Sequence, residues 1–266
     1  MPSPRTPPPS LLPHYTLNGA IPMETFYVNE EYQDDSHYHY ERDEIVGLLN
    51  LHNRLGRLAF RSKSKDWLAD AIKSDLPTGA RAVVFGSVEP WVEVLLLAAG
   101  AANVTTVEYN RLTYDHPQLF TTLAANFQPD GQFDFAVAHG AFDHDGLGRY
   151  GERLHPDGDL LAMRTAWRAL RPGGKLLLSL PTGPDLLVWN LHRRYGPLRL
   201  PRMLAGWKEV RRVGWEGGSR EEANAARDHR QRFEPIFVLE RNSTSDVPMP
   251  PAEPPIVEVV EGGGGG

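Results

Sequence analysis

Four short apolar runs separated by helical segments, from Ala80 onward, constrain the fold of this chain more than any other feature. Each run has the length and the apolar or β-branched composition of a buried parallel strand. The runs are RAVVFG at 81–86, VTTVEY at 104–109, FDFAVAH at 133–139 and KLLLSLP at 175–181. Between them, WVEVLLLAAG (91–100) and DLLAMRTAWRAL (159–170) are typical of helices, and Asp159 is the predicted N-cap of the second. This alternation predicts an α/β fold with a doubly wound, mostly parallel sheet.

The end of the domain has a different connection. A weak strand at 119–122 and a short helix near 200–207 complete the alternation. KEVRRVGW (208–215) and EPIFVLER (234–241) then form a predicted closing pair of strands with no long helix between them. Such a pair predicts an antiparallel strand at the edge of a seven-stranded, Rossmann-like sheet within residues 79–241.

The regions outside this domain differ in composition. Residues 1–24 are rich in proline and the tail 242–266 is rich in Pro, Glu and Gly, so both are predicted to be disordered. Residues 25–78 are predicted to form a helical extension or a lid over the site, with a second helix at 65–76. The first helix is indicated by one amphipathic face, and the lid by an aromatic-acidic stretch. The face comprises Ile45, Leu48, Leu49, His52, Leu55 and Leu58, and the stretch contains Tyr27, Tyr32, Tyr38 and Tyr40.

Composition also excludes several kinds of chemistry. The 266 residues contain no cysteine, which excludes disulfides, thiolate catalysis and Cys-ligated zinc. The net charge of −6 provides no general basic field for nucleic acid, and no apolar run is long enough to span a membrane. The N-terminal residues lack the apolar core of a signal peptide. We therefore expect a cytoplasmic protein without a membrane anchor.

A cofactor site is indicated where the first two strands end, because ligands of such sheets bind at the carboxyl ends of the strands. Gly86 allows close approach of a ligand, but the three-glycine turn that holds a pyrophosphate is missing. This favours a ligand without phosphates, S-adenosylmethionine, with Ser87 and Glu89 near its methionine end. Glu108, followed by Tyr109, closes the second strand, where a carboxylate binds ribose hydroxyls. The structural alternatives are a plain tight turn at Gly86 and a solvated acid at Glu108.

The segment ALRPGGKLLLSLP, a helix stop followed directly by a strand, resembles the corresponding segment of class I S-adenosylmethionine-dependent methyltransferases. Three longer motifs within roughly residues 80–215 resemble an uncharacterised family first catalogued from nematodes as proteins of unknown function. They are FGSVEPWVEVLLLAAGAANVTTVEYN, DHDGLGRYGERLHPDGDL and LPTGPDLLVWNLHRRYGPLRL. The resemblance implies a methyltransferase-like fold without an assigned reaction. Asp143 stands where the family pattern has Glu, and the usual adenine-binding acid after the third strand is not visible.

The glycine-rich stretch 138–156 follows the fourth strand, where the methyltransferase fold places substrate and catalytic groups. His144 is the candidate general base, since a histidine with an ordinary pKa near 6.5 accepts a proton at neutral pH. Asp143 and His139 are further catalytic candidates. Because Asp143 is adjacent in sequence and can point elsewhere, Asp145 or His139 can instead orient the ring or bind substrate, and His139 is also a candidate for binding cofactor. Arg149 and Tyr150 are candidates for binding an anionic group of the substrate. A second polar cluster, also predicted to close the substrate pocket, comprises His192, Arg193 and Tyr195. For each of these groups, packing or solvation is the alternative.

Three functions remain open at this point. We expect S-adenosylmethionine-dependent O-methylation of a small polar molecule or a glycan. The alternatives are a non-catalytic binding or scaffold protein that keeps the fold, and an RNA methyltransferase, which the basic clusters 192–194 and 211–212 suggest. The acidic and histidine residues of 139–159 fit no known spacing of metal ligands, so we assign no metal.

Overall fold

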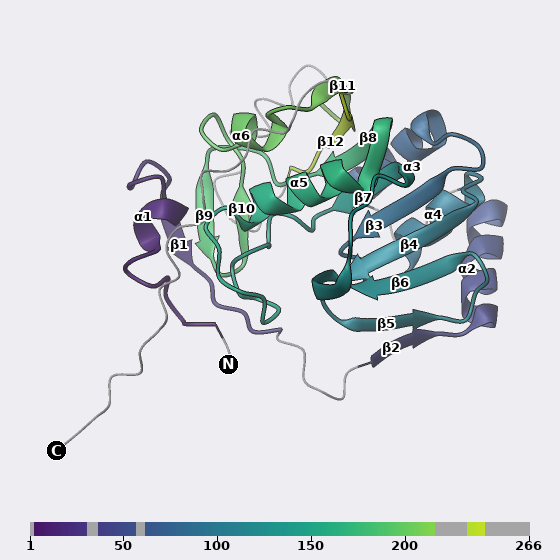
Figure 1. Cartoon of the computed structure of the whole chain (residues 1–266), viewed down its shortest axis with the longest axis horizontal. Coiled ribbons are helices and arrows are strands. Elements are labelled where there is room, and N and C mark those ends of the chain that lie inside the picture. Colours follow the sequence, from purple (N-terminus) through teal and green to yellow (C-terminus); the bar gives the residue numbers. More distant parts are fainter. Residues whose placement is uncertain (1–2, 31–36, 57–61, 216–232, 243–266) are drawn as a thin grey trace.

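The computed structural model describes residues 3–30, 37–56, 62–215 and 233–242, and within them the predicted sheet is confirmed (Figure 1). Its seven strands follow the order β11-β12-β8-β7-β3-β4-β6. All are parallel except β12, which runs antiparallel to both β8 and the edge strand β11. The bounds are β3 Arg81–Phe85, β4 Asn103–Glu108, β6 Leu119–Leu123, β7 Phe133–His139, β8 Leu170–Ser179, β11 Lys208–Val213 and β12 Ile236–Glu240.

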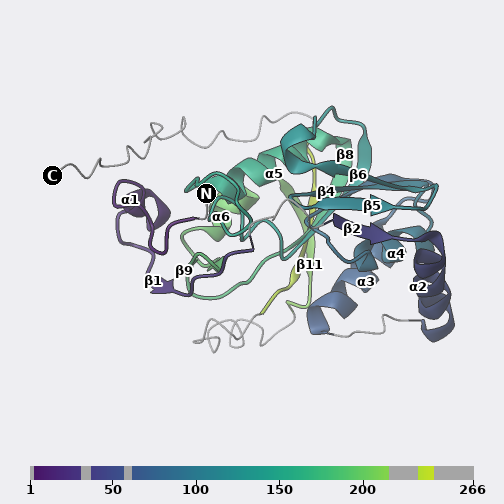
Figure 2. The same cartoon turned by 90° about the horizontal axis from the view of Figure 1, so that it is seen from below.

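Helices cover both faces of this sheet (Figures 1 and 2). On one face lie α5 (Gly158–Ala169) and α6 (Leu200–Leu204), and on the other lie α2 (Arg42–Leu55), α3 (Lys63–Asp75) and α4 (Trp91–Ala98). The strands are buried on both sides, as parallel strands between helices must be. In β7 the alternation is explicit, because Ala136 and Ala138 join the core under α5 while Phe135 and Val137 join the core under α3 and α4.

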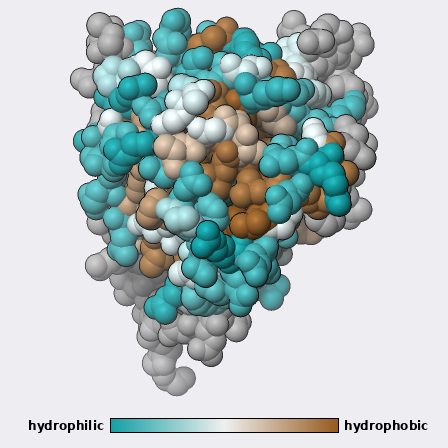
Figure 3. Space-filling view, turned by 90° about the vertical axis from the view of Figure 1, so that its right-hand side faces the viewer, coloured by the Kyte–Doolittle hydropathy of each residue, from teal (hydrophilic) through white to brown (hydrophobic). Residues whose placement is uncertain are grey.

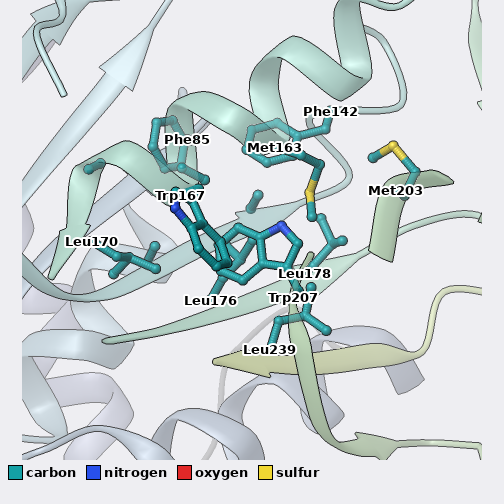
Figure 4. Close-up of a cluster of buried hydrophobic side chains, with 14 of the residues drawn as sticks. Phe85, Phe142, Met163, Trp167, Leu170, Leu176, Leu178, Met203, Trp207 and Leu239 are labelled. Atoms are coloured by element: carbon teal, nitrogen blue, oxygen red, sulfur yellow. The ribbon is translucent and has the colours of Figure 1, made fainter. Parts of the chain in front are cut away.

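The core under α5 is built from large side chains (Figure 4). Trp167 of α5 meets Trp207, which follows α6, in an edge-to-face contact with ring centroids 5.0 Å apart. Met163, Leu178 and Leu239 surround this pair, so α5 is fixed against β8 and β12. The helix that carries one wall of the site therefore has a rigid base.

Helix α2 is less buried than its predicted amphipathic face requires. Its first turn carries a capping box between Glu41 and Glu44. Ile45 is fully buried and Leu49 packs partly against α4, but Leu48 and Leu55 are 38% and 43% exposed. The space-filling view of this side of the molecule shows apolar side chains gathered within a hydrophilic rim (Figure 3). Leu58 lies outside the described residues.

The N-terminal segment corrects a prediction. Instead of a disordered arm, residues 3–24 form a short helix, α1 (Leu12–Tyr15), and β1 (Met23–Thr25). β1 pairs in parallel with β9 (Leu186–Trp189), which pairs in antiparallel with β10 (His192–Arg194). Tyr15 and Ile21 are buried against Leu147, Leu187 and Trp189. The composition of this segment suggested too few apolar side chains to form a core. The apolar partners of Tyr15 and Ile21 come instead from distant parts of the chain.

Other parts of the predicted extension pack on the main sheet. β2 (His37–Tyr40) pairs in parallel with β5 (Arg111–Tyr114), and Tyr40 packs against Tyr114 with ring centroids 6.0 Å apart. Tyr32 and residues 243–266 of the predicted tail lie outside the described residues. No described helix has both the length and the apolar character needed to cross a membrane.

The predicted N-cap of α5 is also wrong by two residues. Asp157 occupies the cap position, and Asp159 lies in the first turn, fully buried. Its carboxylate accepts hydrogen bonds from Nη2 and Nε of Arg199 at 2.6 and 2.8 Å, and from the hydroxyl of Tyr195 at 3.0 Å. Arg193 and Arg199 hold the pKa of Asp159 at about 2, although burial alone would raise it. A buried ion cluster thus occupies the place where the sequence suggested only a cap.

Candidate active site

A cavity of about 450 Å³ opens at the carboxyl ends of β3, β4 and β7, where ligands bind in open α/β sheets. Its volume falls in the ordinary range for small-molecule sites. Its apolar wall comes from strand ends, from the segment after β6 and from α5, and comprises Phe85, Val107, Ala124, Phe127, Phe142, Leu161 and Ala162. Its polar wall comprises Glu108, Tyr109, His144, Asp145, Tyr150, Glu152, Arg153 and His155. Apolar walls with a few polar groups suit a flat aromatic ligand with a polar end.

Gly86 forms the turn that leaves β3 and lines the cavity. Its φ is +70°, a conformation that glycine adopts without strain. A Cβ at this position would stand 2.7 Å from the Cβ of Ala141, in the loop that follows β7. Glycine is required at this position for two reasons, the positive φ of the backbone and the close approach of the loop that follows β7.

Glu108 closes β4 with its carboxylate at the cavity and only 6% of the residue exposed. Its Oε1 accepts hydrogen bonds from the backbone N–H groups of Tyr109 (2.8 Å) and Asn110 (3.3 Å) and from Nδ2 of Asn110 (3.2 Å). Burial raises its pKa above the usual range, and these hydrogen bonds oppose the shift. The predicted position is therefore occupied by a fixed, largely desolvated carboxyl group.

Tyr109 and Tyr150 form an aromatic wall beside that carboxyl group. Their rings stack with centroids 6.0 Å apart and planes 14° apart. The Tyr109 hydroxyl donates to Oδ1 of Asp145 at 3.0 Å. Burial raises the pKa of Asp145 well above its usual range. Asp145 was a candidate for orienting the ring of His144, but its side chain contacts Tyr109 instead.

Glu152 lies in the same wall and was missed by sequence reasoning. Its two carboxylate oxygens accept the backbone N–H groups of Gly148 at 2.6 Å and Tyr150 at 2.9 Å. These bonds fold the segment after Gly146 back on itself and hold Tyr150 at the cavity. A glutamate shortly after two glycines of one loop was the available signal.

His144 lines the cavity and is fixed through its Nδ1 atom. Its Nδ1 lies 2.5 Å from the carbonyl oxygen of Leu191, which requires Nδ1 to carry the proton in the neutral ring. Its Nε2 lies 3.5 Å from Oδ2 of Asp143. The Asp143 side chain is fully buried, and its oxygens accept no hydrogen bond from the described residues. The structure therefore pairs the two residues that the sequence placed side by side, with Nε2 as the basic atom.

Arg149 lies behind His144 and does not line the cavity. Its Nε and Nη2 donate to the two oxygens of Glu30 at 3.0 Å each, and its Nη1 lies 3.2 Å from Nδ1 of His144. The guanidinium also lies over the ring of Tyr150, 5.2 Å from its centroid. The predicted anion clamp is thus engaged by a carboxylate of the N-terminal segment.

His139 faces away from the cavity. Its Nε2 lies 2.9 Å from Oγ of Ser64 in α3, and its ring meets Trp91 of α4 edge to face. Burial, with a smaller effect of Lys65, lowers its pKa to about 4. His139 shares the orientation of Phe135 and Val137 in β7, which explains why the structure does not bring it to His144.

Ser87 and Glu89 also lie outside the cavity lining. Glu89 is exposed, whereas the Ser87 hydroxyl donates to the carbonyl oxygen of Glu89 at 2.8 Å and to Glu93 at 3.1 Å. Glu93 of α4 is fully buried and also accepts from Thr106 at 2.6 Å. Burial raises the pKa of Glu93 to about 7. A glutamate within the apolar run WVEVLLLA was the signal for this buried group.

The second predicted substrate cluster is internal. Arg193 donates from Nη1 to the carbonyl oxygen of Asp145 at 2.7 Å and from Nη2 to that of Pro156 at 3.2 Å. His192 and Tyr195 are buried, and none of the three lines the cavity. Arg193 therefore supports the loop that carries His144, and Tyr195 donates to Asp159 in the first turn of α5.

The lining of the cavity combines a buried carboxyl acceptor with apolar side chains, a combination that suits a nucleoside. Glu108 is a buried acceptor at the strand end where ribose hydroxyls bind, and Ala124 and Phe127 offer apolar contact for a base in place of the missing acid. Over the described part of the chain, no three His, Asp or Glu side chains gather as a metal site would require.

Comparisons with known proteins agree with this fold. A family model described as Caenorhabditis protein of unknown function, DUF268, matches residues 79–237, and no curated protein matches. The Burkholderia thailandensis 1,6-didemethyltoxoflavin-N1-methyltransferase, solved with 1,6-didemethyltoxoflavin and S-adenosylhomocysteine, has a TM-score of 0.52 at 16% identity, covering 76% of this chain and 87% of its own.

Two further solved structures align less closely. The [4+2]-cyclase SpnF has a TM-score of 0.49 at 14% identity, covering 88% of this chain and 93% of its own. An S-adenosylmethionine-dependent methyltransferase from Mesorhizobium loti has a TM-score of 0.42 at 15% identity, covering 65% and 96%. The fold of this chain is that of class I methyltransferases, as its motifs predicted.

Proposed function

This chain belongs to the family of Caenorhabditis proteins of unknown function, DUF268, and from its site we propose that it is an S-adenosylmethionine-dependent methyltransferase. One observation carries the proposal. The buried carboxyl group of Glu108 faces a cavity at the strand ends, across from Gly86. Burying a carboxyl group without a cation is costly, so its position at a cavity is explained best by a ligand that donates hydrogen bonds to it.

The residues that would hold the cofactor follow from the lining. Glu108 accepts the ribose hydroxyls, Ala124 and Phe127 contact the adenine, and Gly86 keeps the turn close to the ligand. Bound S-adenosylmethionine supplies an electrophilic methyl group on a sulfonium. The protein then has to position an acceptor and remove its proton.

His144 acts as the general base. Its Nδ1–H is held by the Leu191 carbonyl, so Nε2 takes the proton of an acceptor hydroxyl, and Asp143 at 3.5 Å stabilises the imidazolium that forms. The acceptor is a small polar molecule or the end of a glycan, because a cavity of about 450 Å³ leaves limited room beside a cofactor. Arg153, exposed at the rim, adds a polar group for it.

The basic clusters that motivate an RNA substrate are engaged within the protein. Arg193 and Arg194 are buried. Arg211 pairs with Asp75, and Arg212 donates to both oxygens of Glu209. None of these four side chains is presented as a free phosphate contact, which favours the small acceptor.

Calorimetry with S-adenosylmethionine and S-adenosylhomocysteine tests the proposal. The wild-type chain is expected to bind both ligands. In H144Q the binding is expected to persist while methyl transfer to an acceptor library falls at least 100-fold. No heat at millimolar ligand would refute the proposal, and binding without turnover in both proteins would favour the scaffold alternative.

A further inference from the structure

We propose that Glu30, in the N-terminal segment, is a positioning residue for His144 and acts through Arg149. The inference rests on the proposed role of His144 as base, but the effect of the Glu30 charge on the titration of His144 can be measured without cofactor. Glu30 lies outside the region that the family model matches, residues 79–237. The active site of this chain would therefore include a residue that lies far from it in the sequence.

Four side chains form one continuous row in which a charged pair, Glu30 and Arg149, lies on one side of the His144 ring and Asp143 lies on the other. The carboxylate of Glu30 receives two parallel hydrogen bonds from Arg149, the bidentate geometry that fixes a guanidinium in its plane. Nη1 of Arg149 lies 3.2 Å from Nδ1 of His144 and 3.4 Å from the carbonyl oxygen of Leu191. Asp143 follows on the other side of the ring. The Leu191 carbonyl is thus a shared acceptor that sets both the imidazole and the guanidinium.

The backbone holds Glu30 in this place. Its N–H donates to the carbonyl oxygen of Arg149 at 2.8 Å. Two residues earlier, the N–H of Val28 donates to Oδ1 of Asn190 at 2.8 Å, and the N–H of Phe26 to the carbonyl of Trp189. The segment from β1 to Glu30 therefore follows the turn between β9 and β10, which also presents the Leu191 carbonyl. Glu30 reaches Arg149 from an extended segment that backbone hydrogen bonds hold along this turn.

The charges have opposite expected effects on His144. Arg149 next to Nδ1 disfavours the imidazolium, and Asp143 next to Nε2 favours it. Glu30 neutralises part of the charge of Arg149, so Glu30 favours the imidazolium indirectly. Burial opposes the charge of Arg149, but the hydrogen bonds and charge of Glu30 outweigh it and raise the pKa of Arg149. The other titratable groups near the ring or on its cavity are Tyr150, His192, Glu108, Tyr109, Asp145, Glu152, Arg153 and His155.

The test is the NMR titration of the His144 ring in the full chain without cofactor, with the resonance assigned by its loss in H144Q. E30Q is expected to lower the titration midpoint by about 0.5 unit and R149Q to raise it by about 1 unit, since charges within 4–6 Å shift such equilibria by 1–3 units. E209Q is the matched control, because Glu209 forms the same bidentate pair with Arg212 away from the cavity. It is expected to leave the midpoint unchanged.

E30D keeps the negative charge, and its His144 midpoint is expected to lie close to that of the wild type. The comparison of E30D with E30Q therefore distinguishes an effect of the charge from an effect of impaired folding. Shifts of the same sign in E30Q and R149Q, or an E30Q shift no larger than that of E209Q, would overturn the proposal. A chain that fails to bind S-adenosylmethionine yet shows the expected midpoints would refute only the proposed function.

Discussion

Replacement of Glu108 by Gln tests the cofactor site most directly. The change keeps the shape of the side chain, and Oε1 can still accept from Tyr109 and Asn110. It removes the negative charge that two ribose hydroxyls would meet. A hydrogen bond to a charged group contributes about 1 kcal/mol more than a neutral one, so two such bonds predict a loss of about 2 kcal/mol. This corresponds to about a 30-fold rise in Kd.

The assay is calorimetric titration with S-adenosylhomocysteine, and E89Q is the control because Glu89 is exposed and outside the cavity. E89Q is expected to keep the wild-type Kd. Folding is not expected to weaken in E108Q, since burial raises the pKa of Glu108 and its ionised form therefore opposes folding at neutral pH. A Kd for E108Q within twofold of wild type would refute the ribose role, as would equal losses in E108Q and E89Q.

Three stability predictions follow from the same geometry, each measured by chemical denaturation. G86A is expected to lower the free energy of unfolding by about 1–3 kcal/mol more than G140A. Both glycines have positive φ, but an added Cβ would collide with another side chain, that of Ala141, only at Gly86. Equal losses of stability in the two variants would contradict this. E93Q is expected to gain stability relative to wild type between pH 5 and 8. The pKa of Glu93 is raised to about 7 when folded, so wild-type stability falls as the pH rises through that window, and a pH-independent difference would contradict the burial effect. D159N is expected to lose about 3–5 kcal/mol at pH 7 because Arg199 loses its buried partner, and a loss below 1 kcal/mol would contradict the ion cluster.

The sheet was predictable because its information is local. Each strand of RAVVFG, VTTVEY and FDFAVAH is an uninterrupted run that can be buried on both faces, and the order of strands follows from the fold family. The site was predictable only as a set of strand ends. Glu108, Tyr109, His144 and Tyr150 reach the cavity, whereas Ser87, Glu89, His139, Arg149, His192, Arg193 and Tyr195 do not line it.

The misplacement of His139 had a signal in the sequence. Side chains alternate between the two faces of a strand, so His139 takes the side of Phe135 and Val137, opposite to Ala138. Assigning each face of FDFAVAH to one of the two helix layers would have excluded His139 from the candidate site residues. No local pattern could indicate that Arg199 would pair with Asp159, because this contact joins the first turn of α5 to the residue that precedes α6, 40 positions later in the chain.

The glycine-rich loop that carries His144 is held by contacts from outside the main sheet, including contacts from the N-terminal segment. A glycine-rich loop loses much conformational entropy on folding, about 1–2 kcal/mol for each residue fixed. Arg193 binds the carbonyl oxygens of Asp145 and Pro156, the Tyr15 hydroxyl binds that of Gly146 at 2.6 Å, and Glu30 holds Arg149. These contacts come from β10, α1 and the segment after β1. The geometry at His144 is therefore set by the three-stranded sheet β1-β9-β10 and the N-terminal segment together. Removal of residues 1–30 is expected to loosen the loop while the main sheet remains folded.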